Sequence, residues 1–261
     1  GARVASVADE AFTLVVVCGG APAFSQSYSH LRYLLAPGAS ANIIHIDAGA
    51  AFMHHRHDVT LEEGASLTET WIHVGREGHD GHSQLLERRV VVGANARFTD
   101  GLVFHPVGHT RVTSNIVLSG EKASARCSTT VVAGGSSVLD YEPVHDHAMA
   151  GGQSDLITKM MASGRSRAVF QGLVLVRKEA PRSDAVQINK NLVLSKRARV
   201  DSLAVSLAKP FSTGTALSLT PSWEKSLVPS LTPSDRASVH WEIALSQSLW
   251  RDGFGRSTSL R

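Results

Sequence analysis

Residues 163–176 read Ser-Gly-Arg-Ser-Arg-Ala-Val-Phe-Gln-Gly-Leu-Val-Leu-Val, and residues 183–195 read Ser-Asp-Ala-Val-Gln-Ile-Asn-Lys-Asn-Leu-Val-Leu-Ser. Apolar residues occupy both parities of the first run: Val169, Leu173 and Leu175 on one, and Phe170, Val174 and Val176 on the other. Because successive side chains of a strand point to opposite faces, this run predicts a strand that is buried on both sides.

The second run predicts another strand, from Ala185 to Leu194, after the polar turn at residues 178–184. Asn189 and Asn191 are two residues apart and share one face, while Leu192 and Leu194 fill the other. Asparagines at this spacing in a buried strand favour a parallel stack in which side-chain amides pair with neighbouring turns of the chain.

A longer motif runs from Val144 to Ser202 and resembles the core domain shared by SufB and SufD, proteins of the SUF iron–sulfur cluster assembly system. It consists of Asp146-His147, Ser154, Lys159, Gly164, Arg167-Ala168-Val169-Phe170-Gln171-Gly172, Asn189-x-Asn191-Leu-x-Leu-Ser195 and Ala198-x-Val200-Asp201-Ser202. The resemblance implies an all-β fold, a right-handed parallel β-helix, over residues 1–208.

The same resemblance implies a non-enzymatic scaffold of the SufD type, in a complex with SufB-like and SufC-like proteins. SufD is preferred to SufB because residues 167–172 and the asparagine pair match it better, and because a cluster-bearing set of cysteines is missing. No catalytic residue, metal ligand or firmly bound cofactor is expected in the chain, and the iron–sulfur cluster is expected to be assembled by the wider complex. The motif residues expected to serve structure or interfaces are His145, His147, Lys159, Phe170, Gly172, Asn189, Asn191 and Asp201.

The earlier part of the chain supports a solenoid independently of the resemblance. Strand-length apolar runs recur between Gly- and Ala-containing turns, and no long stretch holds a helical period. The turn alanines Ala39, Ala65, Ala94 and Ala123 lie 26, 29 and 29 residues apart, as in a repeat protein. The competing fold is an antiparallel sandwich, but only Asp80-Gly81 and Asp100-Gly101 provide two-residue hairpin signals.

Composition narrows the function classes. The chain has 261 residues, 43% hydrophobic and 19% charged, with a net charge of +3 and dispersed basic residues, which gives no reason to expect nucleic acid or a membrane as partner. The apolar run Phe12–Cys18 is too short to span a bilayer and predicts a buried strand. Two distant cysteines, Cys18 and Cys127, favour a reducing compartment. The expected location is the cytoplasm, or the plastid stroma in a photosynthetic eukaryote.

Residues 209–261 differ in character from the rest. They are rich in Ser, Pro, Thr and Leu, with prolines at 210, 221, 229 and 233 that are expected to interrupt any strand or helix before Val239. Val239–Trp250 predicts one short amphipathic helix. Disorder, divergence and translation from a shifted reading frame remain open explanations, and resequencing the DNA for Val200 to Lys209 separates the last from the others.

Three histidine groups are candidate sites. In His54-His55-Arg56-His57-Asp58, His55 and His57 share a face, but the intervening Arg56 favours a solvated or loop cluster over a metal site. His73, with His79, Asp80 and His82, is interpreted as part of a glycine-rich loop. His145 and His147 are expected on one side of a strand, where they hydrogen-bond between stacked coils or across a subunit contact.

Other chemistry has weak support. Cys127 lies in an alternating run and predicts a small buried residue, and no phosphate-binding loop, Cys-x-x-Cys or Gly-x-Ser-x-Gly occurs. The alternatives from other classes are a carbohydrate-active β-helix enzyme resembling polysaccharide lyases, against which the scattered acidic residues argue, and a cupin-like barrel with a metal at His54–His57.

Overall fold

The computed structural model describes residues 12–19, 26–48, 52–74, 83–208, 215–226 and 236–247, and these residues form strands joined by short turns. Among them, no helix is long and apolar enough to cross a membrane. The strands are β1 (Phe12–Gly19), β2 (Gln26–Leu35), β3 (Ser40–Ala48), β4 (Phe52–Leu61), β5 (Ser66–Val74), β6 (Ser83–Val92), β7 (Arg97–His105), β8 (His109–Leu118), β9 (Ser124–Ala133), β10 (Val138–His147), β11 (Gln153–Ala162), β12 (Arg167–Val176), β13 (Asp184–Val193), β14 (Arg199–Ala208), β15 (Thr215–Ser226) and β16 (Arg236–Gln247).

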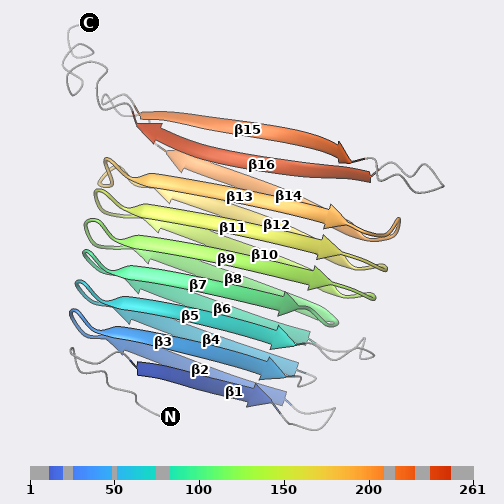
Figure 1. The fold of residues 1–261 in the computed structure, drawn as a ribbon, viewed down its shortest axis with the longest axis horizontal. Coiled ribbons are helices and arrows are strands. Elements are labelled where there is room, and N and C mark those ends of the chain that lie inside the picture. Colours follow the sequence, from blue (N-terminus) through green and yellow to red (C-terminus); the bar gives the residue numbers. More distant parts are fainter. Residues whose placement is uncertain are drawn as a thin grey trace, which may run out of the picture.

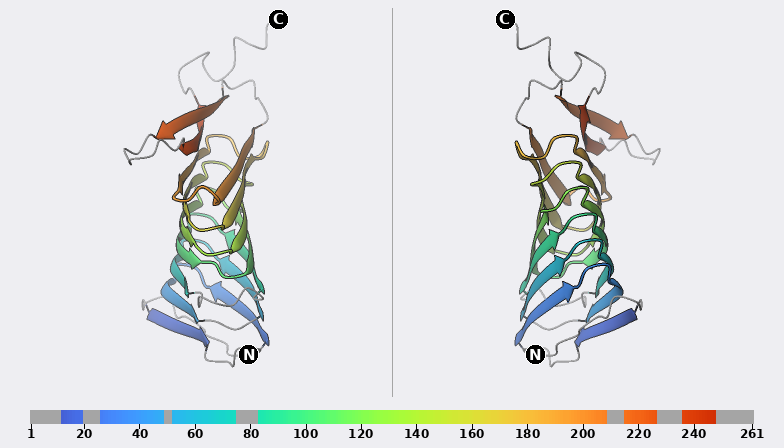
Figure 2. Two further views of the ribbon diagram at one scale, coloured as in Figure 1. Left: turned by 90° about the vertical axis from the view of Figure 1, so that its right-hand side faces the viewer. Right: turned by 90° about the vertical axis from the view of Figure 1, so that its left-hand side faces the viewer.

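The strands wind into a parallel β-solenoid with two walls. Odd-numbered strands from β1 to β13 form one sheet and even-numbered strands from β2 to β14 form the other, and each pairs in parallel with the strand one coil before and one coil after it. Figure 1 shows successive coils lying one upon another from β1 to β14, and Figure 2 shows the two walls and the turns that join them. The predicted solenoid is confirmed, and the antiparallel sandwich is excluded for β1 to β14.

A repeated turn aligns the coils. The amides of Ala39, Ala65, Ala96 and Ala123 each donate to the carbonyl three residues earlier, and all four side chains are fully buried. The third alanine of the repeat is therefore Ala96 rather than Ala94, which the even spacing in the sequence had favoured. Alanine fits here because the turns of successive coils crowd against one another.

The core lies between the two walls. The largest fully buried side chains come from both sheets and include Leu67, Trp71, Phe98, Leu102, Ile116, Leu139, Leu156 and Phe170. In β12 the even-numbered residues face this core, whereas Val169 and Leu173 on the opposite face are only half-buried. The prediction that this strand is buried on both sides is wrong, because no second layer covers its outer face among the described residues.

The last strands break the parallel pattern. β16 pairs antiparallel with β13, and β15 pairs antiparallel with β16. The helix predicted over Val239–Trp250 is wrong where the chain is described, because Arg236–Gln247 is a strand, and Pro221 lies inside β15 rather than ending it. Residues 209–214, 227–235 and 248–261 lie outside the described residues.

Close stacking of the turns generates the first prediction. A Cβ added at Gly93 would lie 2.6 Å from the backbone oxygen of Leu61 in the preceding coil. Gly93→Ala should therefore force the two coils apart and lower the free energy of unfolding by about 2 kcal/mol in urea titrations.

Gly101→Ala is the matched control, because its added Cβ would meet nothing closer than 3.9 Å. Alanine restricts the unfolded chain, so this variant should be unchanged or about 0.5 kcal/mol more stable. Equal losses in the two variants would contradict the proposed role of backbone crowding.

Candidate functional site

Buried and half-buried polar side chains gather in several places inside the solenoid, three of which contain candidate or motif residues. The first, called here the N-terminal cluster, consists of His45, His57, Glu69, Arg88 and Asp100, all at most 3% exposed. The second is the histidine pair, His145 and His147, and the third is the asparagine pair, Asn189 and Asn191. The N-terminal cluster is the candidate site, because burial of this many titratable groups is costly unless they serve one another or a ligand.

Strand register builds the N-terminal cluster from two facing columns. On one wall Glu69 of β5 is directly beside Asp100 of β7, and on the other wall His57 of β4 is directly beside Arg88 of β6. Two carboxylates therefore face an imidazole and a guanidinium across the core, and His45 of β3 completes the group. Like charges in neighbouring strands repel, so Glu69 and Asp100 need a shared cation.

Arg88 is that cation. Its guanidinium donates to both oxygens of Asp100 at 2.8 Å and to Oε2 of Glu69 at 2.9 Å. These hydrogen bonds fix the Glu69 carboxylate so that its other oxygen, Oε1, points toward the histidines. With both carboxylates ionised, Glu69, Asp100 and Arg88 together carry one excess negative charge.

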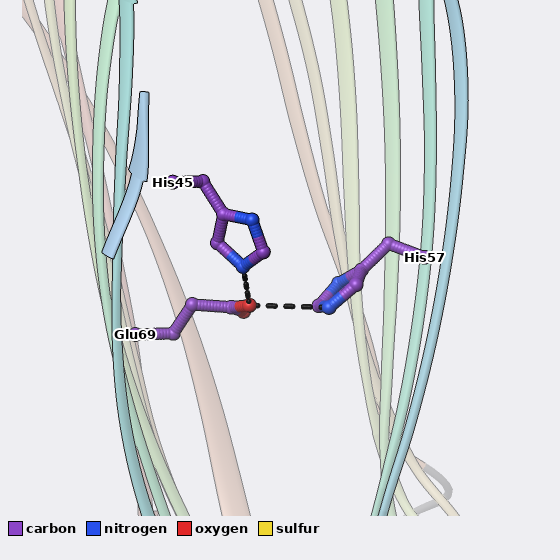
Figure 3. Close-up of side chains that lie close together, drawn as sticks. All are labelled: His45, His57 and Glu69. Carbon is purple, nitrogen blue, oxygen red and sulfur yellow. Dashed lines mark hydrogen bonds and ion pairs between the residues drawn. The ribbon is translucent and has the colours of Figure 1, made fainter. Parts of the chain in front are cut away.

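The two histidines converge on that free oxygen, as Figure 3 shows. Nε2 of His45 lies 2.8 Å from Glu69 Oε1 in hydrogen-bond geometry. Nε2 of His57 lies 3.1 Å from the same oxygen but without hydrogen-bond geometry, so this imidazole points past the oxygen rather than at it. Three donor atoms from β3, β4 and β5 all lie within 4.8 Å of one another.

Aromatic packing holds both imidazoles in place. The ring of His45 stacks on Trp71, its neighbour in the next coil, with centroids 3.8 Å apart and an interplanar angle of 14°. His57 makes edge contacts with Tyr33 at 5.2 Å and with Trp71 at 5.4 Å. The side chains around Glu69 are thus positioned before any ligand arrives.

The pKa values of His57, Glu69 and Arg88 are all shifted by burial and by neighbouring charges. Burial lowers the pKa of His57 to about 4, although Glu69 opposes the shift. Burial alone would raise the pKa of Glu69, but His57, the hydrogen bond from His45, and Arg88 together hold it well below its ordinary value. Burial likewise disfavours charge on Arg88, yet Asp100 and Glu69 raise its pKa above the ordinary value. At neutral pH the site therefore presents a carboxylate and a neutral imidazole.

A small pocket adjoins the N-terminal cluster. It is lined by Asp47, Met53, His55, His73, Gln84, Leu85, Leu86, Phe104 and Thr110. His55 and His73 are both 4% exposed, and burial lowers the pKa of each to about 4. The prediction that His54–Asp58 form a solvated or loop cluster is wrong, because these residues lie in β4 and His55 and His57 face the core. His73 is likewise inside β5 rather than in a loop, whereas His79, Asp80 and His82 lie outside the described residues.

The arrangement of charges predicts a large loss of folding stability when Arg88 is replaced by a neutral residue. Arg88→Met should leave Glu69 and Asp100 buried side by side without a cation and should lower the free energy of unfolding by about 3–5 kcal/mol. Urea titration followed by circular dichroism measures the loss.

Arg89→Met provides the control on the same strand, because Arg89 is exposed on the outer face. Its effect should stay within about 0.5 kcal/mol. If the two variants were equally stable, the burial of Glu69 and Asp100 would not depend on the charge of Arg88.

The histidine pair has a different environment. His145 and His147 both face the core and are 0% exposed, as the alternation predicted. Nε2 of His147 hydrogen-bonds to Ser154 Oγ at 2.8 Å, across the turn between β10 and β11 rather than between stacked coils. Neither ring nitrogen of His145 has a hydrogen-bond partner, and its neighbours in register are Ile116 and Val174. Burial lowers the pKa of His145 to about 3 and that of His147 to about 4.

These shifts predict acid sensitivity with a defined sign. The unfolded chain binds a proton on His145 near pH 6.5, whereas the folded chain does so only near pH 3. The stability that the neutral imidazole contributes is complete above pH 6.5 and is lost as the pH falls, by up to about 1.4 kcal/mol per pH unit.

His145→Leu should lessen this dependence between pH 6.5 and 4, while the other buried histidines with lowered pKa values maintain the rest. It should also add about 1 kcal/mol at pH 7.5, because it removes an unpaired buried polar group. Denaturant unfolding at several pH values measures both effects. The exposed His109 supplies a control, His109→Gln, which should keep the slope of the parent. An unchanged slope in His145→Leu would contradict the assignment.

The remaining motif residues are spread over β11 to β14, near the C-terminal end of the solenoid. Nδ2 of Asn189 and of Asn191 each donate to Ser202 Oγ at 2.8 Å, so the amides join the two walls rather than successive coils. Phe170 is fully buried, and a Cβ at Gly172 would overlap both its ring and the side chain of Gln187. Glycine at this position thus leaves room for Phe170 and Gln187.

Two further motif residues lie on the surface. Lys159 is exposed on β11, and Asp201 pairs with Arg167 at 3.0 Å. The eight motif residues therefore do not form one site. Cys127 is buried as predicted, and burial first, with Asp100 second, raises the pKa of its thiol well above the ordinary value, which disfavours the reactive thiolate.

Sequence reasoning missed His45, Glu69, Arg88 and Asp100. They belong to different strands and follow no short ligand motif. The turn repeat gives the signal only when the correct alanine is used. Aligned on Ala65 and Ala96, His57 and Arg88 occupy equivalent positions on one wall, as do Glu69 and Asp100 on the other, whereas Ala94, which the even spacing favoured, misaligns them by two residues.

Comparison with known proteins gives a consistent result. Residues 18–203 match the family described as SUF system FeS cluster assembly, SufBD core domain. The chain is 25% identical over 183 residues to an iron–sulfur cluster assembly SufBD family protein of Mycobacterium leprae, covering 67% of this chain and 46% of that protein. It is also 25% identical over 214 residues to the iron–sulfur cluster assembly protein SufD of Escherichia coli, covering 68% of this chain and 50% of that protein. The chain thus spans about half the length of these two relatives.

Proposed function

We propose that this chain, which belongs to the SufBD core domain family of the SUF iron–sulfur cluster assembly system, is a SufD-like scaffold that acts without catalytic turnover in a complex with SufB-like and SufC-like proteins. The observation that carries the proposal is the extent of the family match, residues 18–203, which includes nearly the whole solenoid from β1 to β14. Similarity to a protein named SufD favours that branch.

The architecture supports a role in assembly. A solenoid exposes backbone donors and acceptors at its end strands, which can pair with another chain. The seven-stranded wall ends at β2 and β14, and each end strand carries a leucine that is 57% exposed, Leu34 and Leu203. These ends are suitable surfaces for a second β-solenoid.

The proposal treats the iron–sulfur cluster as cargo of the whole complex. The motif residues support the scaffold instead of chemistry: Phe170 and Gly172 pack the core, and Asn189 and Asn191 join the walls. Thiolate chemistry at Cys127 is disfavoured by its raised pKa, so the proposal gives this cysteine no sulfur-accepting role.

Co-purification tests the proposal. The tagged chain should retain SufB and SufC expressed from the same source, and should show no degradation of polyuronates, which a polysaccharide lyase would cleave. Recovery of neither protein would overturn the assembly role.

Substitutions at the ends test how the chain docks. Leu34 and Leu203 lie at opposite ends of the wall, so SufB docking through one end requires only one of them. At least one of the variants Leu203→Glu and Leu34→Glu should reduce SufB recovery at least about tenfold, because a charge at an end strand opposes strand pairing. Val132→Glu is the control, since Val132 is 38% exposed in the middle of the other wall. Equal recovery in all three variants would exclude docking through the ends while leaving the assembly role intact.

A further inference from the structure

We infer that His45, His57 and Glu69 form a binding site for one divalent transition-metal ion of the Zn²⁺ type inside the solenoid. The inference does not depend on the assembly role. It departs from the sequence-based expectation that the chain holds no metal ligand, because the three residues are separated along the chain and are brought together only by the stacking of β3, β4 and β5.

The donor set fits such an ion. Two imidazole nitrogens and one carboxylate oxygen are the ligands of known three-residue zinc sites, in which a fourth position stays open. Metal–donor bonds of about 2.0–2.2 Å in tetrahedral geometry place donor atoms about 3.3 Å apart. Nε2 of His45 and of His57 lie 2.8 and 3.1 Å from Glu69 Oε1. A small outward movement of the side chains would admit the ion once the His45 proton has moved from Nε2 to Nδ1, which has no hydrogen-bond partner.

The charge balance favours a cation. Arg88 neutralises only one of the two carboxylates in the N-terminal cluster, and its two terminal nitrogens bind Asp100 and Oε2 of Glu69. Oε1 of Glu69 has only the imidazoles of His45 and His57 beside it, in a fully buried position where an unbalanced charge is costly. A divalent ion between Oε1 and the two imidazoles would supply the balancing charge.

The surrounding residues hold the ligands ready. Arg88 orients the carboxylate, as hydrogen-bonded groups commonly do around metal ligands. The stacked ring of Trp71 orients His45, and edge contacts from Tyr33 orient His57. The adjoining pocket, with Asp47, His55 and Gln84 in its lining, offers polar groups beside the ligands.

Metal titration of the purified chain, stripped of metal with a chelator, tests the inference. Co²⁺ should bind with one equivalent per chain and give the visible absorption of a four- or five-coordinate site, and Zn²⁺ should displace it. His57→Gln and Glu69→Gln should each weaken Co²⁺ affinity at least about 100-fold, because each removes one of three protein ligands.

His54→Gln is the matched control. His54 precedes the site on the same strand but faces outward and binds Glu87 at 2.8 Å, so this variant should bind Co²⁺ like the parent. Circular dichroism shows whether each variant is folded. If a ligand variant fails to fold, the parent's spectrum and stoichiometry, compared with those of His54→Gln, still decide the question. Absence of stoichiometric Co²⁺ binding to the parent, or equal weakening by His54→Gln and a folded ligand variant, would overturn the inference.

Discussion

Unbroken parallel register is the constraint on which the rest of this structure depends. From β1 to β14 the residues within each pair of strands keep a constant offset to their partners one coil away, as in the pairing of β4 with β6 or β10 with β12. A side chain that faces the core therefore belongs to a column that runs through several coils. Polar residues in such a column must find partners in the neighbouring coil or across the core, because no solvent reaches them.

The fold was largely accessible from the sequence, whereas the candidate site was not. Apolar runs predicted the strands β1, β12 and β13, although Val15 and Val17 of β1 are exposed rather than buried, and the turn alanines predicted the repeat. β4 was missed because His54–Asp58 resemble a solvated segment, although alternation correctly placed His55 and His57 on one face. Their burial follows from partners on other strands, and neither the strand pattern nor the spacing of His45, His57 and Glu69 reveals such partners. The helix expected near Val239 failed for a related reason, because pairing with β15 and β13 outweighed an imperfect helical period.

The two halves of the solenoid interior differ in chemistry. The motif that resembles the family lies mainly in β10 to β14, where nearly all buried polar side chains are uncharged and some link the two walls, such as Asn189 with Ser202. The N-terminal cluster lies in β3 to β7, where ion pairs and imidazoles replace part of the apolar core. Evidence for the family and evidence for a metal site therefore come from separate parts of one scaffold, and each can stand without the other.

The N-terminal cluster also constrains how the coils align. A shift of one residue in any strand from β3 to β7 would turn its polar member outward and leave the opposite charges buried without partners. Columns of apolar side chains alone discriminate less strongly between the correct register and a shifted one, because Val, Leu and Ile substitute for one another at modest cost. Arg88 binds acids from two coils of the facing wall, so it specifies the relative position of β5, β6 and β7 at once. Whether a proton or a metal ion balances the remaining charge, the same alignment of coils is required, and burial of these groups has a structural consequence in either case.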